Sequence, residues 1–528
     1  MKHLAKWLDD ALFYEIYPQS YLDTNSDGIG DLNGVIEKLD YINGLGFNAI
    51  WLNPCFDSPF CDAGYDVRDY KKIAPRYGTM EDMQRLIDEM HSRGMHLFLD
   101  LVAGHTSEEH EWFKASKSSA DNEFSDRYIW AGEDDVFKNA GIGGMAKNTE
   151  GRKGKYHYNF FTVQPSLNFG FAEVTAPWQT PAGSPAAKRT TEAIKDIIRF
   201  WCLKGVDGFR VDMAYSLVKA EKEGRAGTIA VWQDIFAMMD EEFPECAMVS
   251  EWGNARESSL AGFPMDFYMQ MNSLGFGDMF DYGDPEDVDG TPFFSEKGEG
   301  NAAVFAKDIT RLLSENAGRG YLSFITGNHD IHRRPRCLPD AQFKITYGFI
   351  YTMPGVPFMY YGDEIGMREV LDLDPVEGSM YRTGARTPMQ WSSAENAGFS
   401  QADEDELYIP LDSDKNRPTV EQQLADSDSI LNFVKSILAF RKANPALKAS
   451  AGTEFLFAQE DTYPLVYRRF CAEQSLIVAV NPADRAVSAD ISRELRLKPV
   501  FVFGGGAQVN ASKIEMQPQS FAIFEEIR

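Results

Sequence analysis

The sequence is poor in cysteine, has no long apolar run and carries few cations for its length. Its six cysteines are scattered along 528 residues without the paired spacing of a metal-binding motif. No segment approaches the roughly 18–20 consecutive apolar residues that a membrane-spanning helix needs. Internal repeats and low-complexity segments are also missing. These absences exclude a cysteine-based metal centre, a helical membrane span and a repeat architecture.

The N-terminal residues carry no export signal. The only apolar stretch in MKHLAKWLDDALFYEIYP is short, is interrupted by Asp9, Asp10 and Glu15, and lacks a small-residue cleavage site. Cys55 and Cys61 are the only close cysteine pair and could bridge a loop, but a chain without an export signal favours reduced thiols. The expected location is the cytoplasm.

Positive charge is scarce, because 52 Lys and Arg residues face 80 Asp and Glu residues and leave a net charge of −28. Such a field repels nucleic acid and anionic membranes, and it favours a neutral substrate over a phosphorylated one. Solubility alone is an alternative reason for the charge. The 44% of hydrophobic residues suffice for a large core, and the length predicts two or three domains. No nucleic-acid or membrane partner is expected.

Short, continuous apolar runs alternate with amphipathic helical patterns over most of the chain. The predicted strands are 12–18, 48–54, 96–102, 208–214, 246–252, 265–270, 321–326 and 356–361. The predicted helices are 34–45, 80–92, 191–203, 231–242, 302–315, 342–351 and 430–442. Runs that are apolar throughout are typical of parallel strands buried on both faces. Eight such strands with intervening helices predict an α/β fold, a (β/α)8 TIM barrel rather than an open sheet.

Two segments break this alternation. The stretch after strand three is rich in Gly, Asn and aromatic residues and is too long for an ordinary βα loop, which predicts a small inserted subdomain. From about residue 451, short alternating runs such as PLVYRRF and SLIVAVN predict a C-terminal antiparallel β-sandwich. The expected domains are a barrel of residues 1–104 and 188–446, an insertion of residues 105–187 and a C-terminal domain of residues 447–528.

Three carboxylates follow predicted strands: Asp212 closes GFRVD, Glu251 closes CAMVSE, and Asp330 follows FITGNH. A parallel barrel gathers the C-terminal ends of its strands at one mouth, so we expect these acids to converge. Taken singly, each could cap the next helix. Together they suit the cleavage of a glycosidic bond, and a nucleophile and an acid about 5–5.5 Å apart would imply retention of configuration.

A cation accompanies these acids. Arg210 lies two residues before Asp212 on the same strand, so both side chains point to the same side. Its guanidinium is expected to keep Asp212 ionised, as a nucleophile must be. The negative charge of Asp212 and Asp330 is expected to raise the pKa of Glu251, which suits a general acid.

Other polar side chains follow strands two, three and seven. His105 and His329 can donate hydrogen bonds to sugar hydroxyls, although a lone histidine after a strand is more often structural. Tyr65 and Asp66, in GYDVRDY, add an aromatic face and a hydrogen-bond acceptor. We expect all four near the mouth.

Five motifs in order, GYDVRDY, DLVAGH, FRVD, SEWG and GNHD, together resemble those of the α-amylase family of glycoside hydrolases. QPSLNF at 164–169 resembles an additional motif of that family in its inserted domain, and the resemblance spans nearly the whole chain. It implies that Asp212 is the nucleophile, Glu251 the acid/base and Asp330 the residue that binds and distorts the sugar. It also implies further contacts to that sugar from Asp66, His105, Arg210 and His329.

Residues 13–54 and the segment ARTPMQW (385–391) resemble the subgroup of α-glucosidases, oligo-1,6-glucosidases and trehalose synthases. In that subgroup the segment after strand eight leaves a pocket for one terminal glucose, which gives exo attack on short saccharides. Arg386 is expected near this mouth, either on the substrate or in a surface salt bridge. Met213, just after the nucleophile, matches neither the usual α-1,4 nor the usual α-1,6 pattern.

The loop DTNSDGIGD places oxygen ligands at alternate positions, as the start of a calcium loop does. The closing Glu of an EF-hand is missing, because position twelve is Gly34, and Asx-turns without a metal would explain the pattern too. Resemblance to oligo-1,6-glucosidase-like members implies a structural calcium or magnesium site formed by Asp23, Asn25, Asp27, Ile29 (through its carbonyl) and Asp31. The family's other calcium site is not expected, because Gly104 stands where the family has a ligating Asn. No organic cofactor is expected.

The expected function is a retaining exo-α-glucosidase that hydrolyses short, neutral oligosaccharides through a covalent glucosyl-enzyme intermediate. One alternative is a transglucosidase or an isomerase such as a trehalose synthase, whose pocket would exclude water. Another α-amylase-type carbohydrate hydrolase is a further alternative. A non-catalytic binding or transporter-accessory subunit would be expected to have lost acids or gained a membrane anchor.

Overall fold

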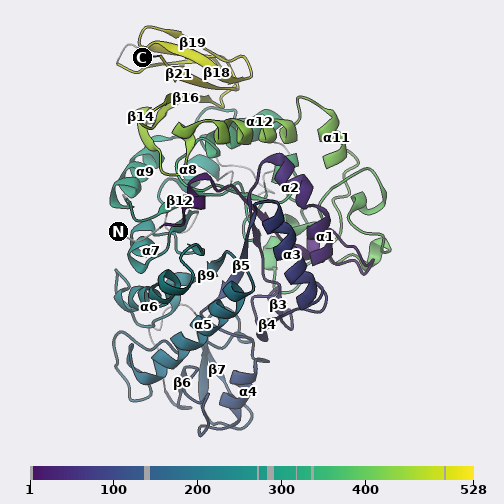
Figure 1. The fold of residues 1–528 in the computed structure, drawn as a ribbon, viewed down its shortest axis with the longest axis vertical. Helices are drawn as coiled ribbons and strands as arrows, with labels where there is room; N and C mark the ends of the chain where they lie inside the picture. Colours follow the sequence, from purple (N-terminus) through teal and green to yellow (C-terminus); the bar gives the residue numbers. More distant parts are fainter. Residues whose placement is uncertain are drawn as a thin grey trace.

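In the computed structural model, eight parallel strands form one sheet at the centre of the molecule (Figure 1). The structure describes residues 4–135, 143–269, 273–281, 283, 291–316, 318–333, 338–492 and 495–527. In their order around the sheet the strands are β12 (Tyr321–Phe324), β11 (Met265–Tyr268), β10 (Ala247–Ser250), β9 (Gly208–Asp212), β5 (His96–Val102), β2 (Ala49–Leu52), β1 (Phe13–Ile16) and β13 (Phe358–Tyr360).

A parallel bridge between Ile325 and Phe358 joins the first and last of these strands and closes the barrel. All eight predicted strands are therefore present, and the predicted (β/α)8 fold is confirmed. Residue 270, the last of one predicted strand, lies outside the described residues. Almost every strand residue is buried, because parallel strands are covered by side chains inside the barrel and by helices outside it.

Helices surround the barrel in Figure 1. Helix α3 shows the local logic: Thr79 closes a capping box at its start, and its buried residues recur every three or four positions. The helices are α1 (Leu32–Glu37), α2 (Leu39–Leu45), α3 (Met80–Ser92), α4 (Glu111–Ser118), α5 (Pro185–Leu203), α6 (Ala226–Glu242), α7 (Ala255–Ala261), α8 (Phe276–Phe280), α9 (Ala303–Asn316), α10 (Asp340–Ile350), α11 (Val420–Ala425) and α12 (Ile430–Ala443). Every predicted helix has a counterpart among them, but the single helix predicted over 34–45 is two helices, α1 and α2, separated at Lys38. No described helix combines the length and the apolar character of a membrane span.

The stretch after β5 contains its own small elements, at the lower end of Figure 1. Helix α4 is followed by an antiparallel sheet of β6 (Trp130–Ala131), β8 (Lys155–Tyr158) and β7 (Gly144–Lys147). A bridge between His105 and Ser166 ties the QPSLNF motif to the end of β5. A short hairpin of β3 (Phe56–Asp57) and β4 (Asp69–Ile73) precedes α3. The insertion thus borders the mouth of the barrel.

The C-terminal strands form two antiparallel sheets at the upper end of Figure 1. The larger sheet contains, in order, β14 (Gly452–Phe457), β15 (Leu465–Phe470), β16 (Ser475–Asn481), β21 (Ser520–Glu526) and β18 (Leu497–Phe503). The smaller one contains β17 (Val487–Asp490), β20 (Lys513–Met516) and β19 (Ala507–Asn510). Val466, Ile477, Ile514 and Met516 belong to an apolar cluster shared by the two sheets. The predicted antiparallel sheet is confirmed.

Candidate active site

The strand-end carboxylates share one cavity of about 190 Å³ at the mouth of the barrel. Asp212 is the last residue of β9, Glu251 directly follows β10, and Asp330 follows β12. The cavity is lined by Asp62, Tyr65, His105, Phe160, Gln164, Asp212, Met213, Tyr215, Glu251, Asp330 and Arg382. The predicted convergence of the three acids is therefore present in the structure.

Arg210 lies beneath the cavity and connects the acids. Its Nη1 donates to Asp100 Oδ1 at 2.8 Å and to Asp212 Oδ1 at 3.2 Å, and its Nη2 donates to Glu251 Oε2 at 2.8 Å. The guanidinium is only 2% exposed, so these charges meet where little water screens them. Arg210 thus fixes the two reacting carboxylates relative to each other.

Asp212 differs from the expectation that Arg210 would keep its carboxylate ionised. Burial raises the pKa of Asp212 well above its usual range, Arg210 opposes this rise, and the charge of Glu251 adds to it. Glu251, whose pKa we expected to be raised, instead accepts hydrogen bonds from Arg210 and from the Met213 amide at 2.9 Å. One guanidinium cannot offset every carboxylate around it, and glycoside cleavage needs one proton on this pair. With that proton on Glu251, Asp212 becomes the ionised nucleophile.

Met213 has a left-handed backbone conformation, with φ of +41°. Such a φ is unfavourable for a residue with a side chain and is found where the surroundings enforce it. Here the conformation aims the Met213 amide at Glu251 Oε2, while the Ser216 amide bonds to the Met213 carbonyl at 3.0 Å. The strained turn therefore joins the end of β9 to the carboxylate after β10.

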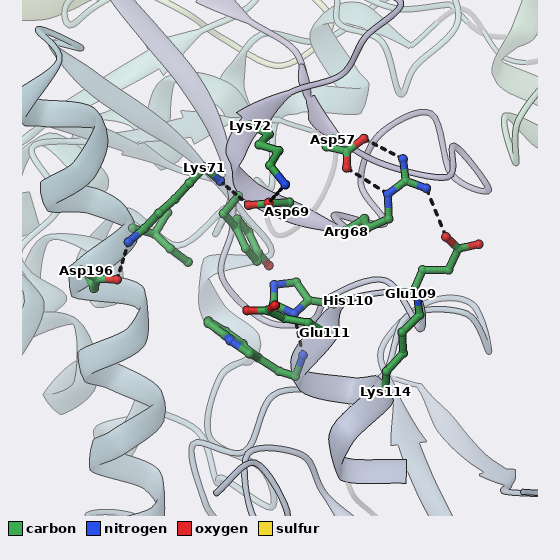
Figure 2. Close-up of a pocket in the computed structure, with 13 residues that line it drawn as sticks. Asp57, Arg68, Asp69, Lys71, Lys72, Glu109, His110, Glu111, Lys114 and Asp196 are labelled. Carbon is green, nitrogen blue, oxygen red and sulfur yellow. Dashed lines mark hydrogen bonds and ion pairs between the residues drawn. The ribbon is translucent and has the colours of Figure 1, made fainter. Parts of the chain in front are cut away.

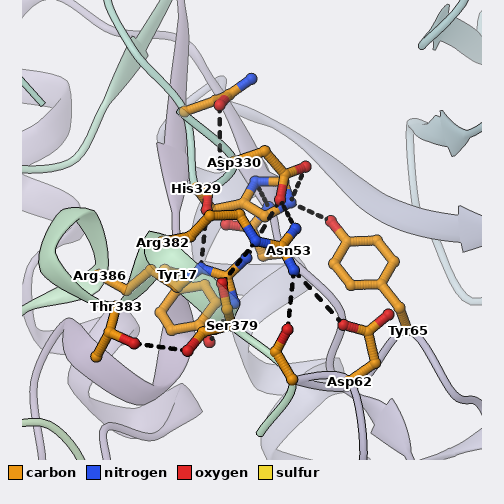
Figure 3. Close-up of polar contacts among 12 residues, drawn as sticks. Tyr17, Asn53, Asp62, Tyr65, His329, Asp330, Ser379, Arg382, Thr383 and Arg386 are labelled. Carbon is orange, nitrogen blue, oxygen red and sulfur yellow. Dashed lines mark hydrogen bonds and ion pairs between the residues drawn. The ribbon is translucent and has the colours of Figure 1, made fainter. Parts of the chain in front are cut away.

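Asp330 is held by three cationic side chains (Figure 3). His329 Nε2 lies 3.1 Å from its Oδ2, and Arg382 and Arg386 both reach its Oδ1, the latter at 3.2 Å. Burial alone would raise the pKa of Asp330, but His329 and the two guanidinium groups hold it well below its usual range. Burial would likewise lower the pKa of His329, whereas Asp330 and Glu15 raise it to about 9. Asp330 is therefore an anion beside the reacting pair.

Tyr65 and His105 line the cavity, as predicted. The Tyr65 hydroxyl lies 2.5 Å from His329 Nε2 and 3.1 Å from Asp100 Oδ2. His105 Nε2 lies 3.1 Å from the Tyr65 carbonyl, and burial lowers the pKa of His105 to about 4, so the ring is neutral at pH 7. These two rings form the wall opposite Asp330.

Asp66 does not reach the cavity, contrary to the expectation that it would contact the sugar. Its carboxylate accepts the amides of Cys61 and Asp62, at 2.8 and 3.0 Å, and the Ser58 hydroxyl at 3.0 Å. These bonds shape the loop that leads to Tyr65. The acid that lines the cavity from this loop is Asp62, four residues earlier.

Arg382, which the sequence analysis did not single out, lines the cavity in place of Arg386. Arg386 is buried, donating from Nε to the His329 carbonyl at 2.8 Å, and it lies neither on the cavity wall nor in a surface salt bridge. Arg382 lines the cavity instead and reaches from Asp330 toward Asp62, whose Oδ1 lies 3.9 Å from Arg382 Nη2. Burial raises the pKa of Asp62 to about 6. The position of Arg382 four residues before Arg386 in YRTGAR was the only sequence signal for it.

Side chains of this chain fill the space beside Gly104. A Cβ at Gly104 would lie 2.8 Å from the Asn159 Nδ2 atom, so Asn159 fills the space that a larger residue would need. The buried Lys219 ammonium donates to Asn159 Oδ1 at 3.0 Å and to the Ser216 carbonyl at 2.7 Å. Asn159 Nδ2 in turn lies 3.3 Å from His105 Nδ1. Burial lowers the pKa of Lys219 to about 7, and its amino group links the insertion to the turn after β9.

We expect a Lys219→Met variant to unfold more easily than the wild type. The change leaves the Ser216 carbonyl and part of Asn159 without a donor, and a buried acceptor without a partner costs about 1–3 kcal/mol. Urea denaturation followed by tryptophan fluorescence measures the loss. Lys222→Met is the matched control, because this side chain is 88% exposed. Equal stability of the two variants would contradict a structural role for Lys219.

The loop proposed to bind calcium is closed by its own hydrogen bonds. Asp23 accepts the amides of Asn25, Ser26 and Gly28 and the Ser400 hydroxyl, all within 3.0 Å. Asp31 accepts Thr24 and caps α1 through the Gly34 amide. Among the described residues, no three Asp, Glu, His or Cys side chains come close enough to hold a metal ion. As arranged, these residues do not fit calcium, and no step is derived through it.

Calcium at this loop stays a prediction that chelation tests. Because the Asx-turns satisfy the loop without an ion, we expect EDTA to leave the melting temperature unchanged. A fall in melting temperature that added calcium reverses, and that disappears in an Asp23→Ala variant, would show that Asp23, Asn25, Asp27, Ile29 and Asp31 rearrange around a metal.

A larger cavity of about 490 Å³ lies elsewhere, between β4, the start of α4 and α5 (Figure 2). Three of the four Lys and Arg side chains that line it pair with neighbouring acids: Arg68 with Asp57 and Glu109, Lys71 with Asp196, and Lys72 with Asp69. None of the strand-end acids lines it. The smaller cavity, with its convergent acids and shifted pKa values, is therefore the candidate active site.

Comparisons with known proteins agree with this geometry. Residues 15–450 match the family described as "Alpha amylase, catalytic domain". The chain is 30% identical to the trehalose synthase/amylase TreS of Mycobacterium tuberculosis, over 94% of this chain and 86% of that protein. It is also 30% identical to an oligo-1,6-glucosidase of Parageobacillus thermoglucosidasius, over 91% of each. A solved isomaltulose synthase variant from Erwinia rhapontici, in complex with its natural substrate sucrose, superposes with a TM-score of 0.82 at 27% identity, covering 99% of this chain and 100% of that one.

Proposed function

Because the chain belongs to the α-amylase family of glycoside hydrolases, we propose that it is a retaining α-glucosidase that removes a terminal glucose from short, neutral α-glucosides. The observation that supports this proposal most is the small size of the cavity. At about 190 Å³ it is smaller than the roughly 300–1,000 Å³ of common ligand sites. Arg382 and Asp62 both line it and lie close to each other, which suits a pocket for one sugar ring better than a groove for a polymer.

The reaction follows from the residues around this pocket. The Asp212 carboxylate attacks the anomeric carbon while Glu251 gives its proton to the departing glycosidic oxygen, and a covalent glucosyl-enzyme forms. Glu251, now ionised, takes a proton from water, and the resulting hydroxide equivalent releases glucose with its α-configuration retained. Asp330 supplies a fixed negative charge beside the oxocarbenium-like transition state. Arg210 holds both reacting carboxylates in fixed positions relative to each other throughout the reaction.

A second candidate is glucosyl transfer to a sugar, as in a trehalose or sucrose isomerase. The relatives named trehalose synthase and isomaltulose synthase support it, since they align over almost the whole chain. Both outcomes use the same covalent intermediate and differ in whether water or a sugar hydroxyl attacks it. Phe160, which is 47% exposed at the edge of the cavity, is placed to contact such a sugar acceptor.

Product analysis with maltose, isomaltose, sucrose and trehalose distinguishes these functions. For the proposed hydrolase we expect free glucose from at least one of these disaccharides, released first as the α-anomer. Conversion into an isomeric disaccharide with little glucose would favour the transferase. Release of the β-anomer would overturn the assigned roles of Asp212 and Glu251. A cytoplasmic location stays part of the proposal, supported by the unlinked thiols of Cys55 and Cys61.

A further inference from the structure

Glu15 is a buried carboxylate that the reaction above does not use. It lies on β1 and has no exposed surface. Its Oε1 accepts from His329 Nδ1 at 2.8 Å and from Asn53 Nδ2 at 3.2 Å, whereas no residue that the structure describes bonds to its Oε2. Burial raises the pKa of Glu15, and the neighbouring His329 opposes that rise. A buried acid with an unpaired oxygen is costly, so its retention here requires a reason.

His329 stands between Glu15 and the active site. Its Nδ1 faces Glu15, and its Nε2 faces Asp330 Oδ2 at 3.1 Å and the Tyr65 hydroxyl at 2.5 Å. An imidazole with a carboxylate at each nitrogen is best satisfied when both nitrogens carry protons. Trp51 packs against the ring edge-on, and the Tyr65 ring stacks on it, so the ring cannot easily turn away.

Other charged groups surround this pair. The Arg386 guanidinium donates to the His329 carbonyl, Arg382 contacts Asp330, and the charge of Arg210 acts on Glu15. Asp100 accepts from the Tyr65 hydroxyl. The three guanidinium groups oppose a positive charge on His329. Glu15 is the carboxylate in contact with His329 that lies outside the substrate cavity.

We infer that Glu15 is a positioning residue: from the inner side of the barrel it holds His329 doubly protonated, so that Nε2 presents a fixed N–H to Asp330, which lines the cavity. This inference rests on the proposed function. The imidazolium neutralises part of the charge of Asp330 and keeps that carboxylate aimed into the cavity. Glu15 therefore acts on the sugar only through His329.

The consequence is a pH dependence with a definite sign. His329 stays protonated at pH values below its pKa, which lies at about 9. Replacing Glu15 by an uncharged isostere removes one of the two carboxylates that hold the proton, so His329 would lose its proton at a lower pH. An opposite charge at contact distance shifts a pKa by about 1–3 units. Activity that needs the imidazolium would then fall at a correspondingly lower pH.

The test compares the wild type with Glu15→Gln on α-D-glucosyl fluoride. Fluoride leaves without a proton from Glu251, so the alkaline limb of kcat/KM no longer reports that acid. We expect kcat/KM of the wild type to fall near pH 9, and kcat/KM of the variant to fall at a pH that is lower by at least about one unit. The control is Glu364→Gln: Glu364 is equally buried and also has an unpaired Oε2, but it bonds to Tyr14 and Tyr41, away from the cavity. This control is expected to keep the wild-type limb.

A double-mutant comparison separates a positioning role from a merely structural one. In a His329→Asn background, adding Glu15→Gln should leave the pH dependence of kcat/KM unchanged, because the imidazole that Glu15 holds is gone. An unshifted limb in the single Glu15→Gln variant would overturn the inference even if its melting temperature falls. If that variant does not fold, the alkaline limb of kcat/KM of the wild type still tests the inference. A limb near the ordinary histidine pKa of about 6.5 would refute it. Failure of the wild type to hydrolyse glucosyl fluoride would instead count against the proposed function.

Discussion

Replacing Asp212 by Asn is expected to lower kcat on every α-glucoside by a factor on the order of 10⁴ to 10⁶, the range found when a nucleophile is removed from a covalent mechanism. The amide keeps the shape of the side chain and a contact to Arg210, but it cannot form the glucosyl ester. Activated substrates should not rescue the variant, because the attacking group itself is missing. Steady-state kinetics with maltose and α-D-glucosyl fluoride measure both effects.

The control for this change is Asp308→Asn. Asp308 is also buried, at 3% exposure, but it lies on α9 and pairs with Arg311, away from the cavity. It is expected to retain most of the activity, which separates loss of the nucleophile from loss of a buried carboxylate. A fluorinated glucosyl fluoride that slows hydrolysis of the intermediate should label the peptide containing Asp212 in the wild type. Label on a different carboxylate would reassign the nucleophile.

The barrel could be predicted because its strands leave a simple trace in the sequence. A strand buried on both faces must be apolar at every position, as in HLFLDLV of β5, and each such run ends where the mouth begins. The positions of Asp212, Glu251 and Asp330 followed from strand ends alone. Helix α7 was missed, because seven residues of ARESSLA are too few to show a clear apolar stripe.

The loop residues of the site were less predictable. Asp62 and Asp66 flank Tyr65 in one loop, and only the backbone conformation decides which carboxylate accepts loop amides and which lines the cavity. Arg382 and Arg386 would share a face if they were four apart on an α-helix, but they lie in a 3₁₀ segment, Met380–Arg386, where residues four apart diverge. Both guanidinium groups nevertheless reach the same oxygen of Asp330, Oδ1.

The distribution of hydrogen-bond donors between the reacting acids could not be read from sequence either. It depends on where donors point: Arg210 Nη2 and the Met213 amide both reach Glu251, and the second exists only because Met213 is held at positive φ. No sequence pattern marks a non-glycine residue for that conformation. The strand ends place the acids close together, and the local backbone conformation determines which acid each hydrogen-bond donor contacts.

A Glu251→Gln variant is expected to lose activity on maltose by about 10²- to 10⁴-fold, the usual contribution of a general acid. The amide can still accept from Arg210 or from the Met213 amide, so the cavity should keep its shape, but it has no proton to give to the glycosidic oxygen. Formation of the intermediate from α-D-glucosyl fluoride should be largely spared, because fluoride departs without protonation. The burst of fluoride release measures that step separately from hydrolysis of the intermediate.

Hydrolysis of the intermediate also needs Glu251, now as the base that activates water. The variant should therefore release one equivalent of fluoride quickly and then turn over slowly, and added azide, which attacks without a base, should restore turnover as glucosyl azide. Asp212→Asn is the matched comparison, since it should show neither burst nor rescue. A Glu251→Gln enzyme with full activity on maltose would exclude Glu251 as the acid. Because Glu251 is the carboxylate paired with Asp212 through Arg210, a different acid would then have to reach the same cavity.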